Sequence, residues 1–453
     1  MTAEDTTNED PQSAPSEPSR RAFLTGAGAV AATALAAAAC AAEDGSPLLS
    51  DEGRAVIAEA ETQAQPTPTD VPVQATTASS ERPITEIAFT GDRQSSVLVP
   101  TTESGLVAAF DVLVTSREEL VATMQDASAE IQRLMANGQL DQVDEFRVPV
   151  ESGAIGPETT TTGVAITVAV GATLFDDRFG LADRRPRELI LMPRFFNDRL
   201  VRDDLSHGDL SFTITGHDQQ AVVFALHQIV RVTERRLRLR WTQDGFNQIL
   251  PEEANTIAET RNLMGFRDGT SNLDSTQPQV MDDFVWVGPD DGEPAWAVGG
   301  SYQAVRIIRI LVEFWGTAAL VRQEQIFGRH RESGAPLGLE NEGDEPSFVS
   351  NPADPNAPTR SHIRLANPRT PDAARIMRRG FSYVNGAAPD GTMDQGLLFT
   401  CYQRSLSRGF VEVQSRLDGE PLEEYIKPVG GGLFFVLPGP GDDGGWLGQS
   451  LLT

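Results

Sequence analysis

A short stretch near the middle of the chain combines an acid, a base and flexible backbone. Residues 261–272 read RNLMGFRDGTSN and place Arg267 and Asp268 between Gly265 and Gly269. Glycine lets a chain turn tightly or approach a flat ligand closely, and the apolar neighbours indicate partial burial. An unpaired buried carboxylate has a raised pKa, and such carboxylates often move protons. The stretch is therefore a candidate proton-transfer site; a structural turn, in which Asp268 pairs with Arg267 or caps backbone N–H groups, is the alternative.

Histidines and cysteines are scarce, which limits the metal and nucleophile chemistry of the chain. The two cysteines, Cys40 and Cys401, are far apart and predict no internal disulfide, and no Gly-x-Ser-x-Gly segment marks a nucleophilic serine. No histidine has the paired spacing of a structural zinc site. We expect Cys401 to be a small buried residue. The five histidines are His207, His217, His227, His330 and His362.

The charge balance disfavours two classes of partner. The chain of 453 residues has 37 lysines and arginines against 65 acidic residues, a formal net charge of −28. Nucleic acids and anionic membrane surfaces attract basic stripes, so we expect neither as a partner.

The N-terminal segment predicts export. Residues 19–40 read SRRAFLTGAGAVAATALAAAAC, in which twin arginines precede a weakly apolar, alanine-rich run. This layout is typical of a twin-arginine signal, which we assign to residues 1–40, so we expect the twin-arginine machinery as a partner and a periplasmic, extracellular or cell-envelope location. Cys40 is a candidate for lipidation, with Ala-x-Ala cleavage as the alternative. Residues 41–83 are rich in Ala, Pro, Thr, Ser and Glu without apolar periodicity, which predicts a disordered linker.

The rest of the chain alternates strand and helix patterns in two similar rounds. In the first round, strands are expected at 105–115, 162–175 and 236–243, and helices at 116–138 and 217–234. Ser116 and Glu119 form a capping box, Gly138 ends that helix, and Asp218 is a plausible N-cap. The second round has strands at 300–315, 396–403 and 432–439 and helices at 317–328 and 407–419, with a long polar loop from 331 to 360.

Each round resembles a β-α-β-β-α-β unit, in which helices cover one face of an antiparallel sheet. The predicted fold class is therefore α+β, with two ferredoxin-like modules packed together. We place the N-terminal module at 84–284 and the C-terminal module at 285–453.

Several motifs occur in a characteristic order behind the export signal. They read NLMGFRDGTSN, EQIFGRHRESGAPLG, SHIRLANP, RIMRRGFSY and DQGLLFTCYQR. As an ordered set they closely resemble the dye-decolourising haem peroxidases, especially the exported branch that includes the deferrochelatase-type enzymes. The resemblance covers roughly residues 163–452.

The resemblance implies haem b, bound without covalent bonds, in the C-terminal module of a dimeric or monomeric protein. It makes His362 the proximal iron ligand, Asp268 the distal acid and base, and Arg378 its distal partner. A packed histidine and a solvated helical face are the alternatives for His362 and Arg378. Glu424 or Asp394 is the expected acceptor for the second nitrogen of His362. Arg329 is a candidate for a haem propionate, and the remaining haem-binding candidates are Arg267, Gly269 and Thr270.

The implied activity is oxidation of dyes, phenols or similar one-electron donors by hydrogen peroxide through a ferryl state. The alternative is a haem-binding or haem-iron acquisition protein with incidental peroxidase activity. Chlorite dismutase-like chemistry is a weaker third alternative. The motifs do not identify the physiological reductant, and a homodimer is a further expectation.

Overall fold

The repeated strand and helix pattern folds into two β-α-β-β-α-β modules. The computed structural model describes residues 87–138, 146, 148–149, 151–156, 160–249, 260–370 and 373–453. All of these residues belong to one compact unit. The expected signal at 1–40 and linker at 41–83 lie outside the described residues.

Among the described residues, the first module contains four strands and two α-helices. Its elements are β1 (Ser104–Val112), α3 (Arg117–Ala136), β2 (Ala165–Gly171), β3 (Leu210–Gly216), α4 (Gln219–Val232) and β4 (Leu237–Phe246). The antiparallel order is β4-β1-β3-β2, the order of a ferredoxin-like unit. Strand β3 was not predicted, because LSFTITG directly precedes the stronger amphipathic pattern of α4.

The second module repeats this order. It contains β7 (Ser301–Ile310), α7 (Leu320–Phe327), β8 (Met377–Ala387), β9 (Met393–Gln403), α9 (Phe410–Leu417) and β10 (Ile426–Val436), with strands in the antiparallel order β10-β7-β9-β8. The sequence missed β8 because consecutive arginines and a glycine interrupt its apolar alternation. The predicted strand at 300–315 is too long: β7 ends at Ile310, and α6 (Val312–Trp315) follows. The other α-helices in the described part of the chain are α5 (Pro278–Phe284), α8 (His362–Ala366) and α10 (Gln449–Leu452).

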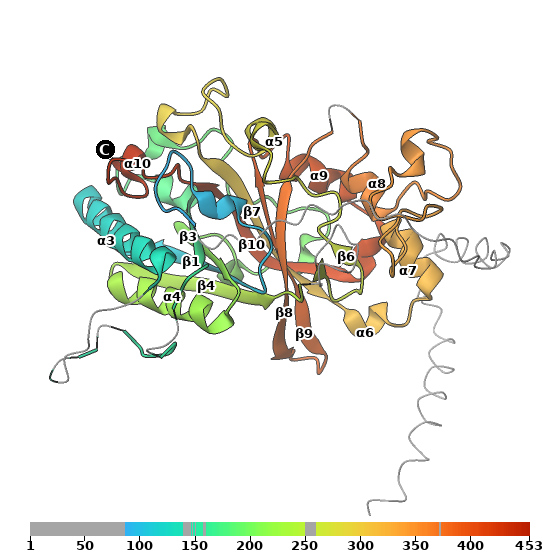
Figure 1. The fold of residues 1–453 in the computed structure, drawn as a ribbon, viewed down its shortest axis with the longest axis horizontal. Helices are drawn as coiled ribbons and strands as arrows, with labels where there is room; N and C mark the ends of the chain where they lie inside the picture. The colour runs from blue at the N-terminus through green and yellow to red at the C-terminus, as the bar shows by residue number, and fades with distance from the viewer. Residues whose placement is uncertain are drawn as a thin grey trace, which may run out of the picture. The chain divides into compact units, whose positions relative to one another are not determined.

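The two sheets join edge to edge into one closed barrel. Strand β10 pairs with β2, and β4 pairs with β8 through Phe246 and Ser382. Apolar side chains from both modules fill one shared core cluster, including Val107, Trp241, Ile307, Leu398 and Phe434. Figure 1 shows α3 and α4 beside the strands of the first module, and α8 and α9 beside those of the second. The predicted boundary between residues 284 and 285 falls between β4 and β7 and stays a prediction.

Local signals fix the ends of the helices in the first module. Ser116 Oγ accepts a hydrogen bond from the Glu119 N–H at 3.2 Å, and the Glu119 carboxylate accepts one from the Ser116 N–H, which completes the predicted capping box. Gly138 has φ of +65°, as expected beyond a helix C-terminus. Asp218 caps α4 by accepting from the Gln220 N–H at 2.7 Å.

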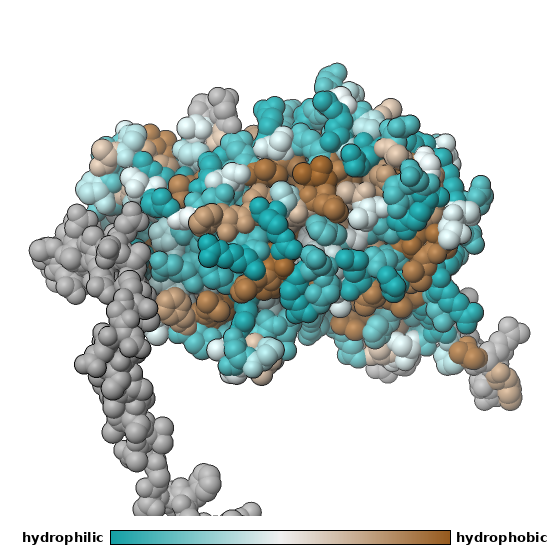
Figure 2. Space-filling model, turned by 180° about the vertical axis from the view of Figure 1, so that it is seen from behind, coloured by the Kyte–Doolittle hydropathy of each residue, from teal (hydrophilic) through white to brown (hydrophobic). Residues whose placement is uncertain are grey.

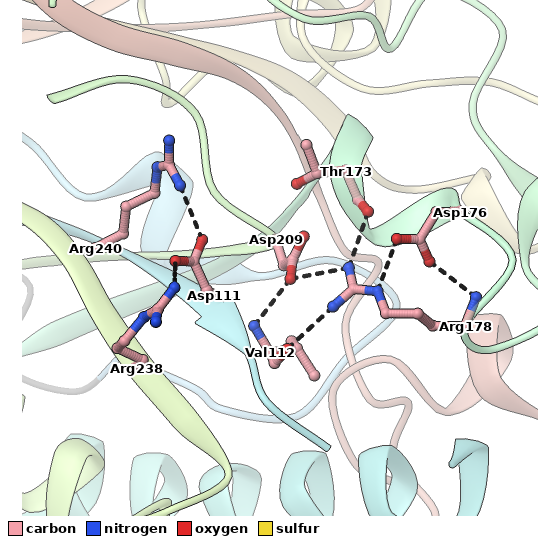
Figure 3. A network of polar contacts seen from close by, with 8 residues as sticks. All are labelled: Asp111, Val112, Thr173, Asp176, Arg178, Asp209, Arg238 and Arg240. Atoms are coloured by element: carbon pink, nitrogen blue, oxygen red, sulfur yellow. Dashed lines mark hydrogen bonds and ion pairs between the residues drawn. The ribbon is translucent and has the colours of Figure 1, made fainter. Parts of the chain in front are cut away.

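A polar network ties the end of β1 to neighbouring strands and loops (Figure 3). The buried Asp209 carboxylate accepts hydrogen bonds from the Val112 N–H at 2.9 Å and from Arg178 Nη2 at 3.0 Å. Asp111 accepts from Arg238 and Arg240 on β4. Because a buried carboxylate is costly without such partners, the network holds the long β2–β3 connection against β1.

The surface carries separate apolar patches. On the face shown in Figure 2, hydrophobic surface is interrupted by hydrophilic side chains. Several exposed apolar side chains belong to one segment before β3: Ile190, Leu191, Phe196 and Leu200. Among the described residues, no helix is both long enough and apolar enough to cross a membrane.

Candidate active site

A large cavity lies against the sheet of the second module. Its volume is about 1800 Å³, counting the space at its mouth. Alternate residues of β7 and β9 line it, while the residues between them, such as Ile307 and Leu398, belong to the core shared by the two modules. Helices α8 and α9 contribute the other wall. The seven site residues predicted from the sequence all line this cavity: Arg267, Asp268, Gly269, Thr270, Arg329, His362 and Arg378.

His362 begins the short helix α8 and is held by a carboxylate. Its Nδ1 lies 2.9 Å from Glu420 Oε2 and 3.1 Å from Oε1, and the Glu420 side chain is almost fully buried. An ionised carboxylate only accepts hydrogen bonds, so Nδ1 carries the hydrogen and donates it. This arrangement leaves Nε2 as the nitrogen available to a metal.

The same carboxylate controls the charge of the imidazole. Burial lowers the pKa of His362, but the negative charge of Glu420 and its hydrogen bond outweigh that effect and raise the pKa above its ordinary value. Arg378 and Asp268 also act electrostatically on His362, in opposite directions.

The expected partners of His362 were wrong. Asp394 instead accepts a hydrogen bond from Asn385 Nδ2 at 3.2 Å, and Glu424 lies four residues beyond the residue that bonds His362. After α9 the chain turns at Gly419, with φ of +73°, and places Glu420 beside α8. His362 and Glu420 are 58 residues apart in the sequence, so no periodic pattern could have indicated that they are in contact.

A small hairpin presents Asp268. Strands β5 (Thr260–Arg261) and β6 (Arg267–Asp268) pair antiparallel. Gly265 has φ of +86° in the turn between them, and Gly269 has φ of +107° directly after Asp268. Both values lie where side chains other than glycine are strained, which explains the two glycines around the Arg-Asp pair.

Arg378 lies on β8 beside this hairpin. Its Nη1 is 3.6 Å from Asp268 Oδ1, and its Nη2 donates to the Thr270 carbonyl at 2.9 Å. The two side chains retain 30% and 25% exposure, respectively, so both remain accessible to a small molecule in the cavity. The sequence missed Asn272, whose amide donates to the Arg378 carbonyl and accepts from its N–H, each at 2.9 Å.

Arg329 is buried in a cationic part of the same cavity. Its Nη1 donates to the carbonyls of Gly334 and Glu342 at 2.6 and 3.1 Å. Burial, together with the positive charges of Arg369 and Arg378, lowers the pKa of Arg329 to about 10. A bound anion would relieve this repulsion.

Arg267 and Thr270 attach the hairpin to the following loop. Arg267 Nε lies 3.3 Å from the Glu332 carbonyl and 3.8 Å from Glu342 Oε2, and Thr270 Oγ1 donates to Glu342 Oε1 at 2.6 Å. These contacts give both residues a loop-anchoring role, so direct binding of a cofactor by either one stays a prediction.

The other histidines have separate surroundings. His217 pairs with Glu103, His330 lies 3.2 Å from Glu324, and His227 is exposed. The His207 carbonyl accepts a hydrogen bond from Trp241 Nε1 at 2.7 Å. No group of three or more metal-binding side chains occurs in the part of the chain that the structure describes. His362 is therefore the histidine that lines the cavity together with Asp268 and Arg378.

The fold and the cavity define an α+β enzyme in which a carboxylate-bound histidine shares a cavity with an acid and a guanidinium. The chain belongs to the Dyp-type peroxidase family, whose N-terminal model matches residues 94–247 and whose C-terminal model matches residues 259–440. It is therefore a haem-dependent peroxidase.

Proteins similar to this chain over most of its length support the assignment. The deferrochelatase of Yersinia pseudotuberculosis is 43% identical over 366 residues, covering 80% of this chain and 84% of the relative. The deferrochelatase of Escherichia coli strain K12 is 42% identical over 367 residues, covering 80% and 86%.

Solved structures share the fold. Ferric DtpA from Streptomyces lividans is 32% identical with a TM-score of 0.72, and covers 82% of this chain and 99% of its own. A DyP-type peroxidase from Streptomyces coelicolor is 33% identical with a TM-score of 0.72, and covers 82% and 98%. These neighbours confirm the predicted α+β fold of ferredoxin-like modules.

Proposed function

We propose that this protein is an exported haem b peroxidase that reduces hydrogen peroxide with electrons from phenols, dyes or similar donors. The observation that carries the proposal is the presence in one cavity of two side-chain pairs: His362 with Glu420, and Asp268 with Arg378. The first pair suits iron ligation and the second suits proton transfer to and from peroxide.

The residues of the cavity fit a haem group. The hydrogen bond to Glu420 orients the His362 ring and leaves Nε2 free for iron. Apolar side chains from the sheet and α9 suit the flat macrocycle: Ile308, Ile310, Leu397, Phe399 and Val413. The crowded cations Arg329 and Arg369 suit its carboxylates. The chain has no Cys-x-x-Cys-His segment, and Cys401 is fully buried, which favours haem held without thioether bonds.

When bound, haem iron supplies the redox chemistry. The chain's own residues supply the proton transfer that peroxide cleavage needs. The Asp268 carboxylate takes a proton from one peroxide oxygen and returns it to the other, which then leaves as water. Arg378 stays cationic and stabilises the negative charge that develops on the departing oxygen. Its hydrogen bond to the Thr270 carbonyl fixes the guanidinium for this task.

Reconstitution with haem followed by a turnover assay tests the proposal. The expected result is a Soret band that is lost in His362→Ala, together with peroxide-dependent oxidation of a phenol by the wild-type protein. No Soret band in the wild type, or a haem complex that does not oxidise phenols with peroxide, would overturn it.

A second candidate function is release or transfer of haem iron with incidental peroxidase activity. The deferrochelatase name of the relatives at 42–43% identity favours it. The rate of iron loss from bound haem, compared with peroxide turnover under the same conditions, separates the two functions.

Export rests on the sequence alone. The twin arginines at Arg20 and Arg21 and the alanine-rich run after them support export by the twin-arginine machinery. Replacing both arginines by lysine is expected to keep the protein in the cytoplasm, and unchanged export would contradict this.

The predicted homodimer is tested by the mass of the holoprotein in solution.

A further inference from the structure

One side chain of the haem cavity is readily oxidised and has no role in the chemistry above. Met264 lines the cavity and carries the only sulfur atom among the described residues of its wall. It lies in the turn of the hairpin that presents Asp268, four residues before that carboxylate. A thioether therefore shares one cavity with the group that handles peroxide.

The hairpin turn holds Met264 in place. The Met264 N–H donates to Asn262 Oδ1 at 3.0 Å, and its carbonyl accepts from Trp315 Nε1 at 3.0 Å. The N–H of Gly265, the next residue, donates to the Asn262 carbonyl at 2.9 Å. Because the backbone is bonded on both sides of the side chain, the thioether stays in the cavity wall.

The thioether is shielded from the bulk solvent. Met264 is only 4% exposed and belongs to an apolar cluster that also contains Phe266, Trp315 and Phe327. Phe266 stacks on Phe327 with ring centroids 3.9 Å apart, which closes this end of the cavity with aromatic side chains. A strong oxidant therefore reaches the sulfur through the cavity rather than from the surface of the protein.

We propose that Met264 is an internal two-electron donor, which is oxidised to methionine sulfoxide when peroxide is present and external donors are absent. The inference rests on the proposed peroxidase function. Methionine differs from the phenylalanines beside it because its thioether takes up an oxygen atom directly. One-electron donors such as phenols consume the same peroxide, so they protect the sulfur.

The reaction balances without a further reagent. The O–O bond of peroxide breaks, one oxygen atom forms a bond to the sulfur lone pair, and the other leaves as water with both protons. The sulfur loses the two electrons that peroxide gains. Asp268 moves the proton between the two oxygens, as it does with external donors.

Peptide mass spectrometry of the holoprotein tests the inference. Cleavage after Arg261 and Arg267 gives the peptide NLMGFR, in which Met264 is the only methionine. With peroxide and no donor, this peptide is expected to gain an oxygen atom in the holoprotein and to stay unmodified in the haem-free protein. A phenol added before the peroxide is expected to prevent the change, and methionine sulfoxide reductase is expected to reverse it.

Two other methionines are internal controls. Met393 is 45% exposed and lies outside the cavity wall, so bulk peroxide is expected to oxidise it equally with and without haem. Met281 is 1% exposed and does not line the cavity, so it is expected to stay unmodified in both forms. Met264→Leu keeps the size and apolar character of the side chain but cannot form a sulfoxide, so the corresponding peptide is expected to gain no oxygen.

The other outcomes count against the inference. An unmodified NLMGFR peptide in a holoprotein that oxidises phenol would overturn it and leave the peroxidase function intact. Equal oxidation of Met264 with and without haem would also overturn it, as would an oxygen atom still gained in Met264→Leu. Failure of the holoprotein to oxidise phenol with peroxide would overturn the peroxidase function itself, and with it this inference.

Discussion

His362 Nδ1 lies 2.9 Å from the Glu420 carboxylate, and this contact joins the start of α8 to the chain that follows α9. It fixes which nitrogen carries the hydrogen and orients the ring. It also gives the imidazole a partner that stabilises positive charge, whether that charge comes from a proton or from a bound metal.

Glu420→Gln is expected to weaken haem binding without abolishing it. The amide keeps the size of the side chain but loses the charge, and removal of such a partner of a ligating histidine typically costs about 10–100-fold in metal affinity or activity. Titration of the haem-free protein with haem, followed by absorbance, measures the change. Glu234→Gln, at an exposed acid of the first module, is a control that is expected to bind as the wild type does. Unchanged affinity in Glu420→Gln would contradict the role given to this carboxylate.

The raised pKa of His362 predicts how the stability of the haem-free protein depends on pH. The folded chain binds this proton more tightly than the unfolded chain, whose histidine pKa is about 6.5. The stabilisation is therefore fully present below about pH 6.5 and is lost as the pH rises through the folded pKa. Urea midpoints measured from pH 5.5 to 9 are expected to fall more steeply in the wild type than in Glu420→Gln. Parallel curves would contradict this account.

Asp268→Asn is expected to slow the reaction with peroxide by about 10²–10⁴-fold, because the amide cannot shuttle a proton. The haem content is expected to stay unchanged, because Asp268 contacts Arg378 rather than His362, the proposed iron ligand. Stopped-flow mixing of the holoprotein with peroxide measures the rate. Arg378→Leu is expected to slow the same step, whereas Asp177→Asn, at an exposed acid outside the cavity, is not. Wild-type rates in the first two variants would refute their roles.

The sequence predicted the elements with strong local signals and missed those defined by tertiary contacts. The capping box at Ser116 and the N-cap at Asp218 were found because a helix end needs a nearby hydrogen-bond partner. Strand β8 was missed because pairing with β4 and β9, rather than its own composition, makes it a strand. Strand β3 was missed although LSFTITG alternates apolar and polar residues, because the stronger helical pattern of α4 follows it directly.

The residues of the candidate site divide in the same way, into those that local motifs predicted and those that only the structure revealed. His362, Asp268 and Arg378 lie in recognisable motifs, and the structure brings all three into one cavity. Glu420 and Asn272 act through contacts with distant parts of the chain: Glu420 bonds a histidine 58 positions earlier, and Asn272 bonds the backbone of a residue 106 positions later. No local sequence pattern indicates such a long-range contact, so the roles of Glu420 and Asn272 can be recognised only in the folded structure.

Gly328 is expected to be essential for the position of α8. Gly386 is a matched control, because it has a similar backbone conformation without close neighbours. Gly328 ends α7 with φ of +88°, and a Cβ there would lie 2.8 Å from Ile363 Cγ1 and 2.8 Å from Ser361 Oγ. Gly386 has nearly the same φ, +92°, but no atom lies within 4 Å of a Cβ built on it. Alanine at either position carries the left-handed backbone strain of about 1–2 kcal/mol, but alanine at 328 also pushes against the two residues flanking His362.

Gly328→Ala is therefore expected to lose more stability than Gly386→Ala and, unlike it, to bind haem more weakly, because the shift reaches His362, the proposed iron ligand, through α8. Urea unfolding and haem titration of the two variants measure both effects. Equal losses of stability with equal haem affinity would show that backbone strain alone matters at 328. Such a result would mean that α8 adjusts without moving His362 away from Glu420.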